Sequence, residues 1–514
     1  MWKVSPLWGQ QVIGADLAAD FVSQRLQSGQ ASRVSTGNVD VISDRTPTSP
    51  VQTNAIKLDL LPAGDYPQHG DQTASLVSNP PFGVSPAVSW SALVNLETRQ
   101  NDISKAKEAW NSNFISGLEA IDRTQTRLVT ASIAYYGLSP RDAIDSFVDR
   151  GKMFIQAAGN DYPVPSFRGS APHVGHIIVG SVGPNGIQTP YSREPTKIYA
   201  PSDDIQLSGP NDRFGGTSGA APLVTGSIVN ALAILPNLSN SEIEDLLART
   251  SLPSFSQAIG YGPGLLNSYR MVVVAACLAD KSSTQKETFT NLKDVTCFDQ
   301  SIKAQEFRKD ADRLLKNMSC VSQRDGLKAL RASFLLQPSR DTALKLAEIY
   351  ERLGFPGDAR WYHAAAATLG TPEEQLRHFD KLLSEPSLVN YSYFGFGIER
   401  VKSRGFHALS LASRMPSNSP YVQITLDRIA SLARSNNLSD QEQALDQAMI
   451  VGPRALPAIA RLIVDSDDDQ TPRSAWNIIG RLMSYEDVQH SWYHETIAFL
   501  RGSPFERYLP RSIR

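Results

Sequence analysis

The residue of this chain best placed for chemistry is a serine in a tight turn that is flanked by glycines. Ser218 lies in residues 216–222, which read Gly-Thr-Ser-Gly-Ala-Ala-Pro, and an apolar segment follows from Leu223. Small neighbours let a substrate reach the hydroxyl, and a helix that begins here would place its positive end beside developing negative charge. A Gly-Thr-Ser-Gly run alone is typical of an ordinary loop, so the interpretation depends on the rest of the chain.

Two other clusters precede the serine. His69 is followed by Gly-Asp-Gln-Thr-Ala-Ser-Leu, which is typical of a helix start, and the apolar run 154–158 leads into Gly159 and Asn160. We expect Asn160 at the carboxyl end of a strand, the edge where open parallel α/β sheets bind ligands. A histidine can accept the proton of a serine, and a side-chain amide can donate to an oxyanion. The three clusters predict a base, an oxyanion donor and a nucleophile.

In these motifs the chain resembles the subtilisin-like serine proteases, the subtilases. Residues 157–160 read Ala-Ala-Gly-Asn, like the family's oxyanion motif, and residues 216–222 reproduce its serine motif. The resemblance covers about residues 5–280 and implies a doubly wound, mostly parallel α/β sheet. It also implies a serine endopeptidase that hydrolyses peptide bonds by a Ser/His/Asp mechanism. Catalysis of this kind requires no cofactor, and the sequence leaves a structural calcium ion open.

The acid of such a triad is expected at the end of the first core strand. The family reads Val-x-Val-Ile/Val-Asp-Ser/Thr-Gly there, and this chain reads Val-Asp-Val-Ile-Ser-Asp over residues 39–44. Aligning the valines puts Ser43 at the position of the acid and Asp44 one residue later. Because strand side chains alternate between faces, Asp44 needs a bulge to reach the histidine. We predict Asp44 as the acid, with Asp40 as the alternative; without an acid the chain would be an inactive, binding scaffold.

By the same resemblance, Ser132, Ile133 and Ala134 line the substrate cleft, where an extended peptide would pair with the edge of their strand. The glycines usual in the family at this place are replaced by Ala134 and two tyrosines. The replacement predicts a cleft that is narrowed on one side and accepts few substrates.

The pattern of the chain changes near residue 280. Strand signals nearly vanish, and helix-length segments with apolar residues three and four apart take their place. We predict a subtilisin-like peptidase domain over 1–280, a linker over 281–301, helices that resemble tetratricopeptide repeats over 302–390, and a helical domain that resembles HEAT repeats over 391–514. Helical repeats expose broad surfaces for proteins or peptides, so this half is predicted to bind a protein partner or position substrate. Alternatively, its helices pack onto the protease and are needed for folding.

Composition narrows the partners further. Lys and Arg number 50 against 52 Asp and Glu, which gives no electrostatic reason to expect nucleic acid or an anionic membrane as a partner. No stretch approaches the length of a membrane span, so we expect no transmembrane segment. His173 and His176 are spaced like metal ligands, but no third ligand lies near them in the sequence, so we predict a surface loop and no metal site.

Cysteine and the N-terminus bear on the compartment. Cys277, Cys297 and Cys320 all fall outside the three motifs, and one bridge between Cys297 and Cys320 would be allowed in an oxidising compartment. The N-terminal residues lack the apolar core of a signal peptide. The sequence as printed therefore indicates a cytoplasmic protein, or a secreted or periplasmic one if a leader precedes it.

Overall fold

The computed structural model describes residues 3–40, 56–58, 69–78, 82–96, 103–133, 138–160, 166–167, 171–207, 213–285, 295–317, 319–385, 405–416, 418–435, 437–451 and 455 of the 514-residue chain. These residues fall into two compact units, Trp2–Leu369 and Gly370–Arg514. The first unit holds every predicted catalytic motif.

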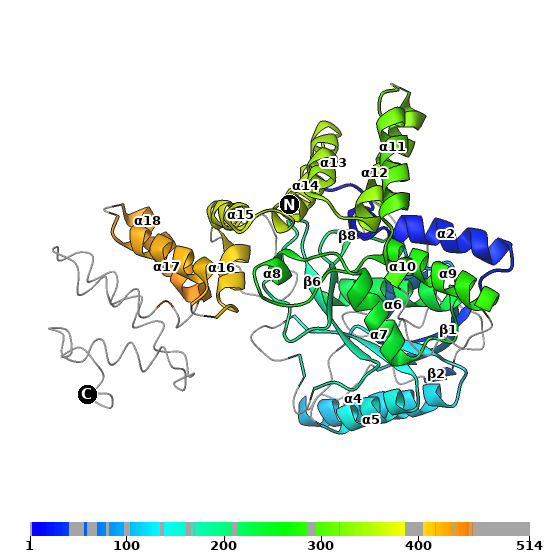
Figure 1. Cartoon of the computed structure of the whole chain (residues 1–514). Coiled ribbons are helices and arrows are strands. Elements are labelled where there is room, and N and C mark those ends of the chain that lie inside the picture. Colours follow the sequence, from blue (N-terminus) through cyan, green and yellow to red (C-terminus); the bar gives the residue numbers. More distant parts are fainter. Residues whose placement is uncertain are drawn as a thin grey trace. The chain divides into compact units, whose positions relative to one another are not determined.

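A parallel sheet forms the centre of the first unit (Figure 1). Its seven strands lie in the order β2-β3-β1-β4-β5-β6-β7, and every neighbouring pair is parallel. The strands are β1 Val34–Asp40, β2 Ile56–Leu58, β3 Val88–Asn95, β4 Leu128–Ala131, β5 Met153–Ala157, β6 His176–Val182 and β7 Ile198–Pro201; a separate two-stranded ribbon joins β8 Ile205–Gln206 to β9 Arg213–Phe214. Central strands such as β5 and β6 are buried along their whole length, as expected for a sheet covered on both faces.

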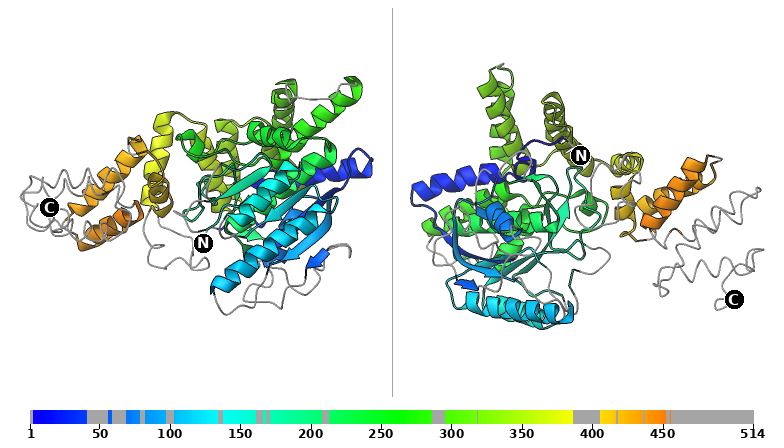
Figure 2. Two further views of the ribbon diagram at one scale, coloured as in Figure 1. Left: turned by 90° about the horizontal axis from the view of Figure 1, so that it is seen from below. Right: turned by 180° about the vertical axis from the view of Figure 1, so that it is seen from behind.

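Helices cover both faces of this sheet (Figures 1 and 2). On one face, Phe114 of α4 and Phe147 of α5 pack into an apolar cluster with Phe154 of β5. On the other face, α6 contacts β4 to β7, and it also packs against α2, α3 and α9. The helices are α1 Trp8–Val12, α2 Ala15–Gln27, α3 His69–Ser78, α4 Ile103–Asp122, α5 Ser139–Asp149, α6 Thr217–Ile234, α7 Asn240–Thr250, α8 Phe255–Ala258 and α9 Ser268–Gln285. The predicted doubly wound fold is confirmed.

Helix α6 is the central helix of this unit. Its 18 residues are long and apolar enough to cross a membrane by length and composition, and all of them are buried inside the protein. The expectation that no stretch approaches this length is therefore wrong. The apolar composition is explained by the place of the helix, because a helix enclosed on all sides by sheet and helices has no polar face.

Four further helices and one short turn of helix complete the first unit: α10 Val295–Phe298, α11 Ser301–Leu314, α12 Cys320–Leu336, α13 Arg340–Arg352 and α14 Pro356–Thr368. The pairs α11–α12 and α13–α14 pack as helical hairpins (Figure 1). The structural division lies at residues 369 and 370, whereas the predicted linker, 281–301, falls inside the first unit. The end of α9 and all of α10 lie within that predicted linker.

Buried polar contacts join α12 and α14 to the start of the chain. The guanidinium of Arg331 in α12 pairs with the Asp16 carboxylate at 2.5 Å, and the Arg331 side chain is only 5% exposed. The carboxylate of Asp358 in α14 accepts hydrogen bonds from the Ser5 backbone N–H at 2.7 Å and the Ser5 hydroxyl at 2.6 Å. Because Arg331, Asp358 and Ser5 are buried, each contact satisfies polar atoms that would otherwise lack partners.

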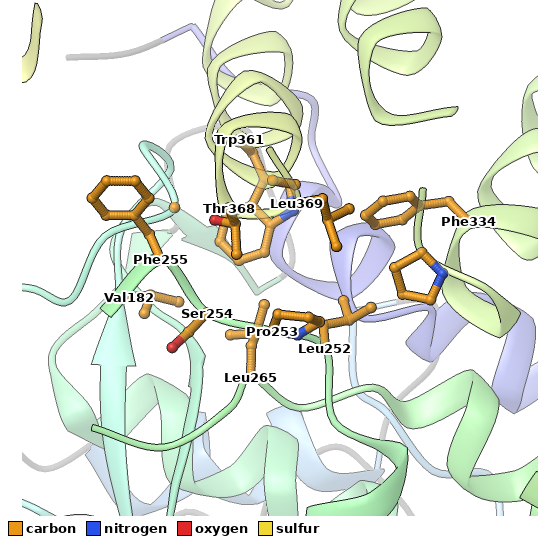
Figure 3. A pocket seen from close by; sticks show the side chains of 13 residues that line it. Val182, Leu252, Pro253, Ser254, Phe255, Leu265, Phe334, Trp361, Thr368 and Leu369 are labelled. Atoms are coloured by element: carbon orange, nitrogen blue, oxygen red, sulfur yellow. The ribbon is translucent and has the colours of Figure 1, made fainter. Parts of the chain in front are cut away.

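Apolar side chains line a small pocket at the same junction (Figure 3). Val182, Leu252 and Leu265 come from the sheet and its connections, and Phe334, Trp361 and Leu369 come from the later helices. Trp361 also meets the buried Trp8 ring edge-on, with ring centroids 5.9 Å apart. Helices α12 and α14 therefore share a core with the sheet-containing part.

The second unit is helical where the structure describes it. Its helices are α15 Pro372–Ser384, α16 Phe406–Ala412, α17 Pro420–Ala433 and α18 Leu438–Val451. Phe379 of α15 packs edge-on against Tyr421 of α17, with ring centroids 5.2 Å apart. Most of the stretch on which the HEAT resemblance rested lies beyond residue 451, outside the described residues apart from residue 455. Repeat architecture stays a prediction.

The disulfide bond joins a different pair of cysteines from the one that the sequence allowed. Cys277 of α9 bonds to Cys297 of α10, with their Cα atoms 5.6 Å apart, while Cys320 is exposed and free. The bridge between Cys297 and Cys320 that the sequence left open therefore does not form. Because α9 packs against α10, the two cysteines that are 20 residues apart meet.

Candidate active site

The residues of the predicted site gather at the carboxyl edge of the sheet. Asp40 is the last residue of β1, Ser132 follows β4, and Asn160 follows β5. The chain order reverses between β1 and β4, which are neighbours in the sheet. In open α/β sheets, ligands bind in the crevice outside such a reversal, so the fold alone indicates a binding site here.

Asp40 and His69 are in direct contact. The His69 Nδ1 atom lies 2.7 Å from Asp40 Oδ1, and the Asp40 side chain is fully buried whereas that of His69 is 24% exposed. The Thr73 hydroxyl, one turn further along α3, donates to the other carboxylate oxygen at 3.2 Å. A carboxylate can only accept a hydrogen bond, so His69 Nδ1 carries the hydrogen that it donates to Asp40. This leaves His69 Nε2 as the nitrogen available to a substrate or nucleophile.

Burial and charge act against each other on His69. Burial lowers the pKa of His69, but the adjacent Asp40 carboxylate and its hydrogen bond raise that pKa, and the net effect is a pKa above the ordinary 6.5. The ring also packs at a tilt against Phe214, with centroids 5.3 Å apart. The histidine is thus held on one side by a carboxylate and on the other by an aromatic ring.

The contact with histidine belongs to Asp40, which sequence reasoning ranked second. Asp44, the first choice, lies outside the described residues. Asp40 lies between the two valines of the aligned motif, three residues before Ser43, so its carboxylate leaves the sheet earlier than the family pattern predicts. β1 carries a register shift against β3 between Thr36 and Gly37, so its side chains do not follow a simple alternation along the strand.

Ser218 is the second residue of α6, and the backbone before it is set by glycine. Gly216 has φ 71° and ψ 174°, a conformation in which a side chain would be strained. Pro222 has no N–H for the Ser218 carbonyl four residues earlier. The Ser132 hydroxyl donates to that carbonyl instead, at 3.0 Å, and the Ser218 hydroxyl donates to the Ser132 carbonyl at 3.2 Å.

Asn160 is oriented by the first residue of the same helix. Both the backbone N–H and the hydroxyl of Thr217 donate to Asn160 Oδ1, each at 2.9 Å. A backbone N–H can only donate, so the atom that faces it is the side-chain oxygen and not the nitrogen. The Nδ2 group, with its two hydrogens, is therefore on the other side of the amide and available as a donor.

Comparison with known proteins places this geometry in a family context. Residues 62–262 match the subtilase family, Peptidase S8. This stretch is a subtilase-family domain. The chain is 27% identical over 227 residues to Subtilisin amylosacchariticus of Bacillus subtilis subsp. amylosacchariticus and to Subtilisin J of Geobacillus stearothermophilus. Each of these matches covers 40% of this chain and 56% of the relative, so the chain spans little more than half the length of these relatives.

Solved structures that are similar to part of this chain include the following two. A cold adapted subtilisin-like serine proteinase is 19% identical with a TM-score of 0.37, and the match covers 46% of this chain and 89% of that one. MycP1 from Mycobacterium smegmatis is 16% identical with a TM-score of 0.39, and the match covers 53% of this chain and 85% of that one.

Ser218 and His69 are the predicted nucleophile and base. Among the described residues, Ser218 and His69 form no hydrogen bond with each other; the Ser218 hydroxyl donates to Ser132 instead. Ser218 is 8% exposed. A rotation about the Cα–Cβ bond of Ser218 moves the hydroxyl without moving the backbone, since serine has a single side-chain torsion among heavy atoms.

The predicted cleft residues differ in environment. Ser132 is buried, and Ile133 is partly buried against the apolar cluster between the sheet and α4 and α5. Ala134 and the two tyrosines after it lie outside the described residues. Ser132 therefore contacts the serine directly, and Ile133 contributes to packing.

The two histidines with metal-like spacing are separated by burial. His176 begins β6, is fully buried and hydrogen-bonds Gln156 at 2.8 Å, and burial lowers its pKa to about 3. His173 is exposed and contacts Asp149 at 3.0 Å. No group of three or more possible metal ligands occurs among the residues that the structure describes. The prediction of a surface loop is therefore confirmed for His173 and wrong for His176, which is buried in β6.

Several residues of the site were missed at the sequence level. Thr73 orients the carboxylate, and Asn38 donates to the Gly70 carbonyl at 2.9 Å, which ties β1 to the first turn of α3. Thr73 lies four residues after His69 and is therefore on the same face of α3. That spacing was a usable signal, whereas the place of Asn38 depends on the pairing of strands distant in the sequence.

Proposed function

We propose that this chain is a serine endopeptidase in which Ser218 is the nucleophile, His69 the general base and Asp40 the acid. The observation that carries the proposal is the 2.7 Å contact between His69 Nδ1 and the buried Asp40 carboxylate, at the sheet edge that also holds Ser218. A histidine oriented by a buried acid beside a serine is the arrangement that activates a hydroxyl for attack on a carbonyl. The match of residues 62–262 to the subtilase family supports it.

In the first step, the Ser218 hydroxyl leaves the Ser132 carbonyl and turns to His69 Nε2. His69 accepts the proton as the oxygen attacks the scissile carbonyl, and it returns that proton to the leaving amine. Asp40 holds the Nδ1 hydrogen and stabilises the positive ring that exists between these two transfers. A water molecule then attacks the acyl-serine by the same path, which releases the second product and restores the hydroxyl.

The tetrahedral intermediate carries its charge on the former carbonyl oxygen. Asn160 Nδ2 and the backbone N–H of Ser218 would donate to that oxygen. Thr217 fixes the orientation of the Asn160 amide, so the donor is preorganised and requires no rearrangement during the reaction. The N-terminus of the 18-residue helix α6 adds a favourable electrostatic contribution at the same place.

The substrate class is peptide or protein, by analogy with the subtilases. An extended segment would lie along Ser132 and the residues after it, as in other cases of peptide addition to a strand edge. Protein binding by the C-terminal helices stays a prediction. For residues 302–369, the buried contacts of Arg331 and Asp358 support a structural role in the first unit.

Digestion of an unfolded protein tests this function, with new amino termini identified by mass spectrometry. The full chain is expected to produce them, and Asn160→Ala is expected to lower the turnover number by about 10²–10³-fold. This variant removes the oxyanion donor and also the acceptor for Thr217, so a second variant has to separate the two effects.

Asn160→Asp provides that separation. A carboxylate still accepts from the Thr217 N–H at the start of α6, so the variant is expected to keep its thermal stability. It offers no donor and adds negative charge beside the oxyanion, so turnover should fall at least as far as in Asn160→Ala. Full activity in both variants would remove Asn160 from the oxyanion site. No cleavage by the folded wild type would favour the inactive scaffold.

A further inference from the structure

A buried acid lies behind the loop that carries Ser218. Asp203 follows β7 by two residues, is 5% exposed, and has a φ of 61°. Residues other than glycine rarely adopt this left-handed conformation, and they do so where the surroundings enforce it. Here the buried Trp8 indole donates to the Asp203 backbone carbonyl at 3.2 Å, which fixes the peptide from the side of α1.

The Asp203 carboxyl has one occupied and one unoccupied oxygen. The Tyr191 hydroxyl donates to Oδ1, and the Gly216 backbone N–H faces the carboxyl group closely enough to lower its pKa. Oδ2 is buried and has no hydrogen-bond partner among the described residues. Burial raises the pKa of Asp203 to about 6, although the hydrogen bond from Tyr191 opposes this rise. Oδ2 is therefore the atom at which a proton would bind.

The neighbouring Ser202 holds the other side of the same peptide. Its hydroxyl donates to the Gly216 carbonyl and lies 3.3 Å from the Tyr191 hydroxyl. The Gly216 N–H is thus directed to Asp203 and the Gly216 C=O to Ser202. Gly216 has φ 71° and directly precedes Thr217, the first residue of α6. The orientation of its peptide therefore sets the direction of the first turn of α6, which carries Ser218.

From these contacts we infer that Asp203 is a positioning residue for the nucleophile: its carboxylate holds the Gly216 peptide so that Ser218 faces the site. This inference rests on the proposed peptidase function. Asp203 touches neither substrate nor the reacting atoms. It would act through the backbone that precedes the serine, and only its ionised form would hold the Gly216 N–H firmly.

Activity would then depend on a second ionisation besides that of His69. The groups facing Asp203 are few: Tyr191 from the connection between β6 and β7, and Asp204, its neighbour in the chain, whose negative charge raises the pKa of Asp203. Trp8, from α1, carries no charge. Arg213 acts on Asp204, where it lowers the pKa against the effect of burial. In the acid range, the rate of the reaction should fall as both His69 and Asp203 become protonated.

The stability of the fold should change in the opposite direction to activity. An acid whose pKa is raised in the folded state destabilises that state in its charged form. The loss of folding stability begins as pH rises above 3.8, the ordinary pKa of the carboxyl group, and is complete above about 6. Asp203→Asn removes the buried charge, so it should unfold at a higher temperature than the wild type at pH 8 while reacting more slowly.

The test is the pH dependence of Ser218 acylation by a fluorophosphonate in the full-length chain. Asp203→Asn is expected to lower the labelling rate at pH 8 by about 10–100-fold, the loss that misplacement of a reacting group causes. The decrease of its labelling rate toward acid pH (the acid limb of the pH profile) should also become shallower, because one of the two ionisations is gone. Asp204→Asn is the matched control, with the same change of charge in a neighbouring residue of similar φ, 52°; its labelling rate should stay within about twofold of the wild type.

Tyr191→Phe provides a second measurement that does not depend on how well Asp203→Asn folds. It removes the hydroxyl that lowers the pKa of Asp203, so the second ionisation should move to higher pH. Labelling of Asp203→Asn at the wild-type rate, or an unmoved acid limb in Tyr191→Phe, would overturn the positioning role. Failure of the wild type itself to label would instead refute the peptidase function.

Discussion

Asp40→Asn is expected to lower peptide turnover by about 10⁴-fold while the chain stays folded, the loss that the same change causes in a serine-protease triad. Asparagine has nearly the shape of aspartate, so packing around the fully buried side chain is kept. It cannot hold the Nδ1 hydrogen of His69 as a carboxylate does, and its N–H₂ group can instead favour the wrong tautomer. A histidine whose Nε2 carries the hydrogen cannot accept the proton of Ser218.

The same variant should change the response to pH. The Asp40 charge keeps the pKa of His69 above 6.5 despite burial, so Asp40→Asn should move the acid limb to lower pH. The sign for stability follows from the raised pKa. The contact stabilises the fold fully below pH 6.5, and this contribution is lost as pH rises through the pKa of folded His69. Asp40→Asn should therefore destabilise more at pH 6 than at pH 9, as measured by denaturant unfolding.

Asp44→Asn is the matched control, since it makes the same substitution at the residue that the sequence analysis predicts as the acid. It should leave turnover within about twofold of the wild type. The reverse result, an inactive Asp44→Asn with an active Asp40→Asn, would transfer the role of the acid to Asp44. If both variants keep the turnover of the wild type, Ser218 and His69 act without either carboxylate.

Truncation after residue 300 is expected to prevent folding of the subtilase-containing unit. The cut removes α11 to α14, and with them Arg331, the buried partner of Asp16, and Trp361, which covers the buried Trp8. Removing one partner of a buried ion pair alone costs about 3–5 kcal/mol, a large part of the stability of an ordinary domain. The fragment should be insoluble, or lack near-ultraviolet circular dichroism and cooperative melting.

A cut after residue 369 is the control for that experiment. It falls at the boundary between the two compact units and keeps the buried contacts of Arg331 and Asp358. The 1–369 fragment should be soluble, melt cooperatively and react with a serine probe. A soluble 1–300 fragment that reacts equally well would show that the later helices are dispensable for folding, and would revive their role in binding a partner.

Sequence reasoning found the residues that depend on local pattern. Ser218, His69 and Asn160 each lie in a short motif whose residue types follow from the turn or strand end that holds them. The doubly wound sheet was implied by the resemblance of these motifs to the subtilases. These features could be predicted because each needs only neighbours within a few residues.

The features that the sequence left open or did not reveal depend on contacts between distant residues. Whether Asp40 or Asp44 faces His69 depends on the end and register of β1, and the motif departs from the family pattern there. The pairing of Cys277 with Cys297 depends on how α9 meets α10. Likewise, Asp358 could be interpreted from sequence only as a residue of a repeat-like helix, whereas its carboxylate binds Ser5. A helical pattern shows an apolar face but not the surface that covers it.

The most direct test of the account is covalent labelling of the full chain by a fluorophosphonate, with the modified residue mapped by mass spectrometry. We expect one label per chain, on Ser218, and none in Ser218→Ala, which keeps the fold. His69→Ala should label far more slowly, because the hydroxyl would lack its base. A folded wild-type chain that takes no label, or takes it equally well in Ser218→Ala, would contradict the assignment of Ser218 as the nucleophile.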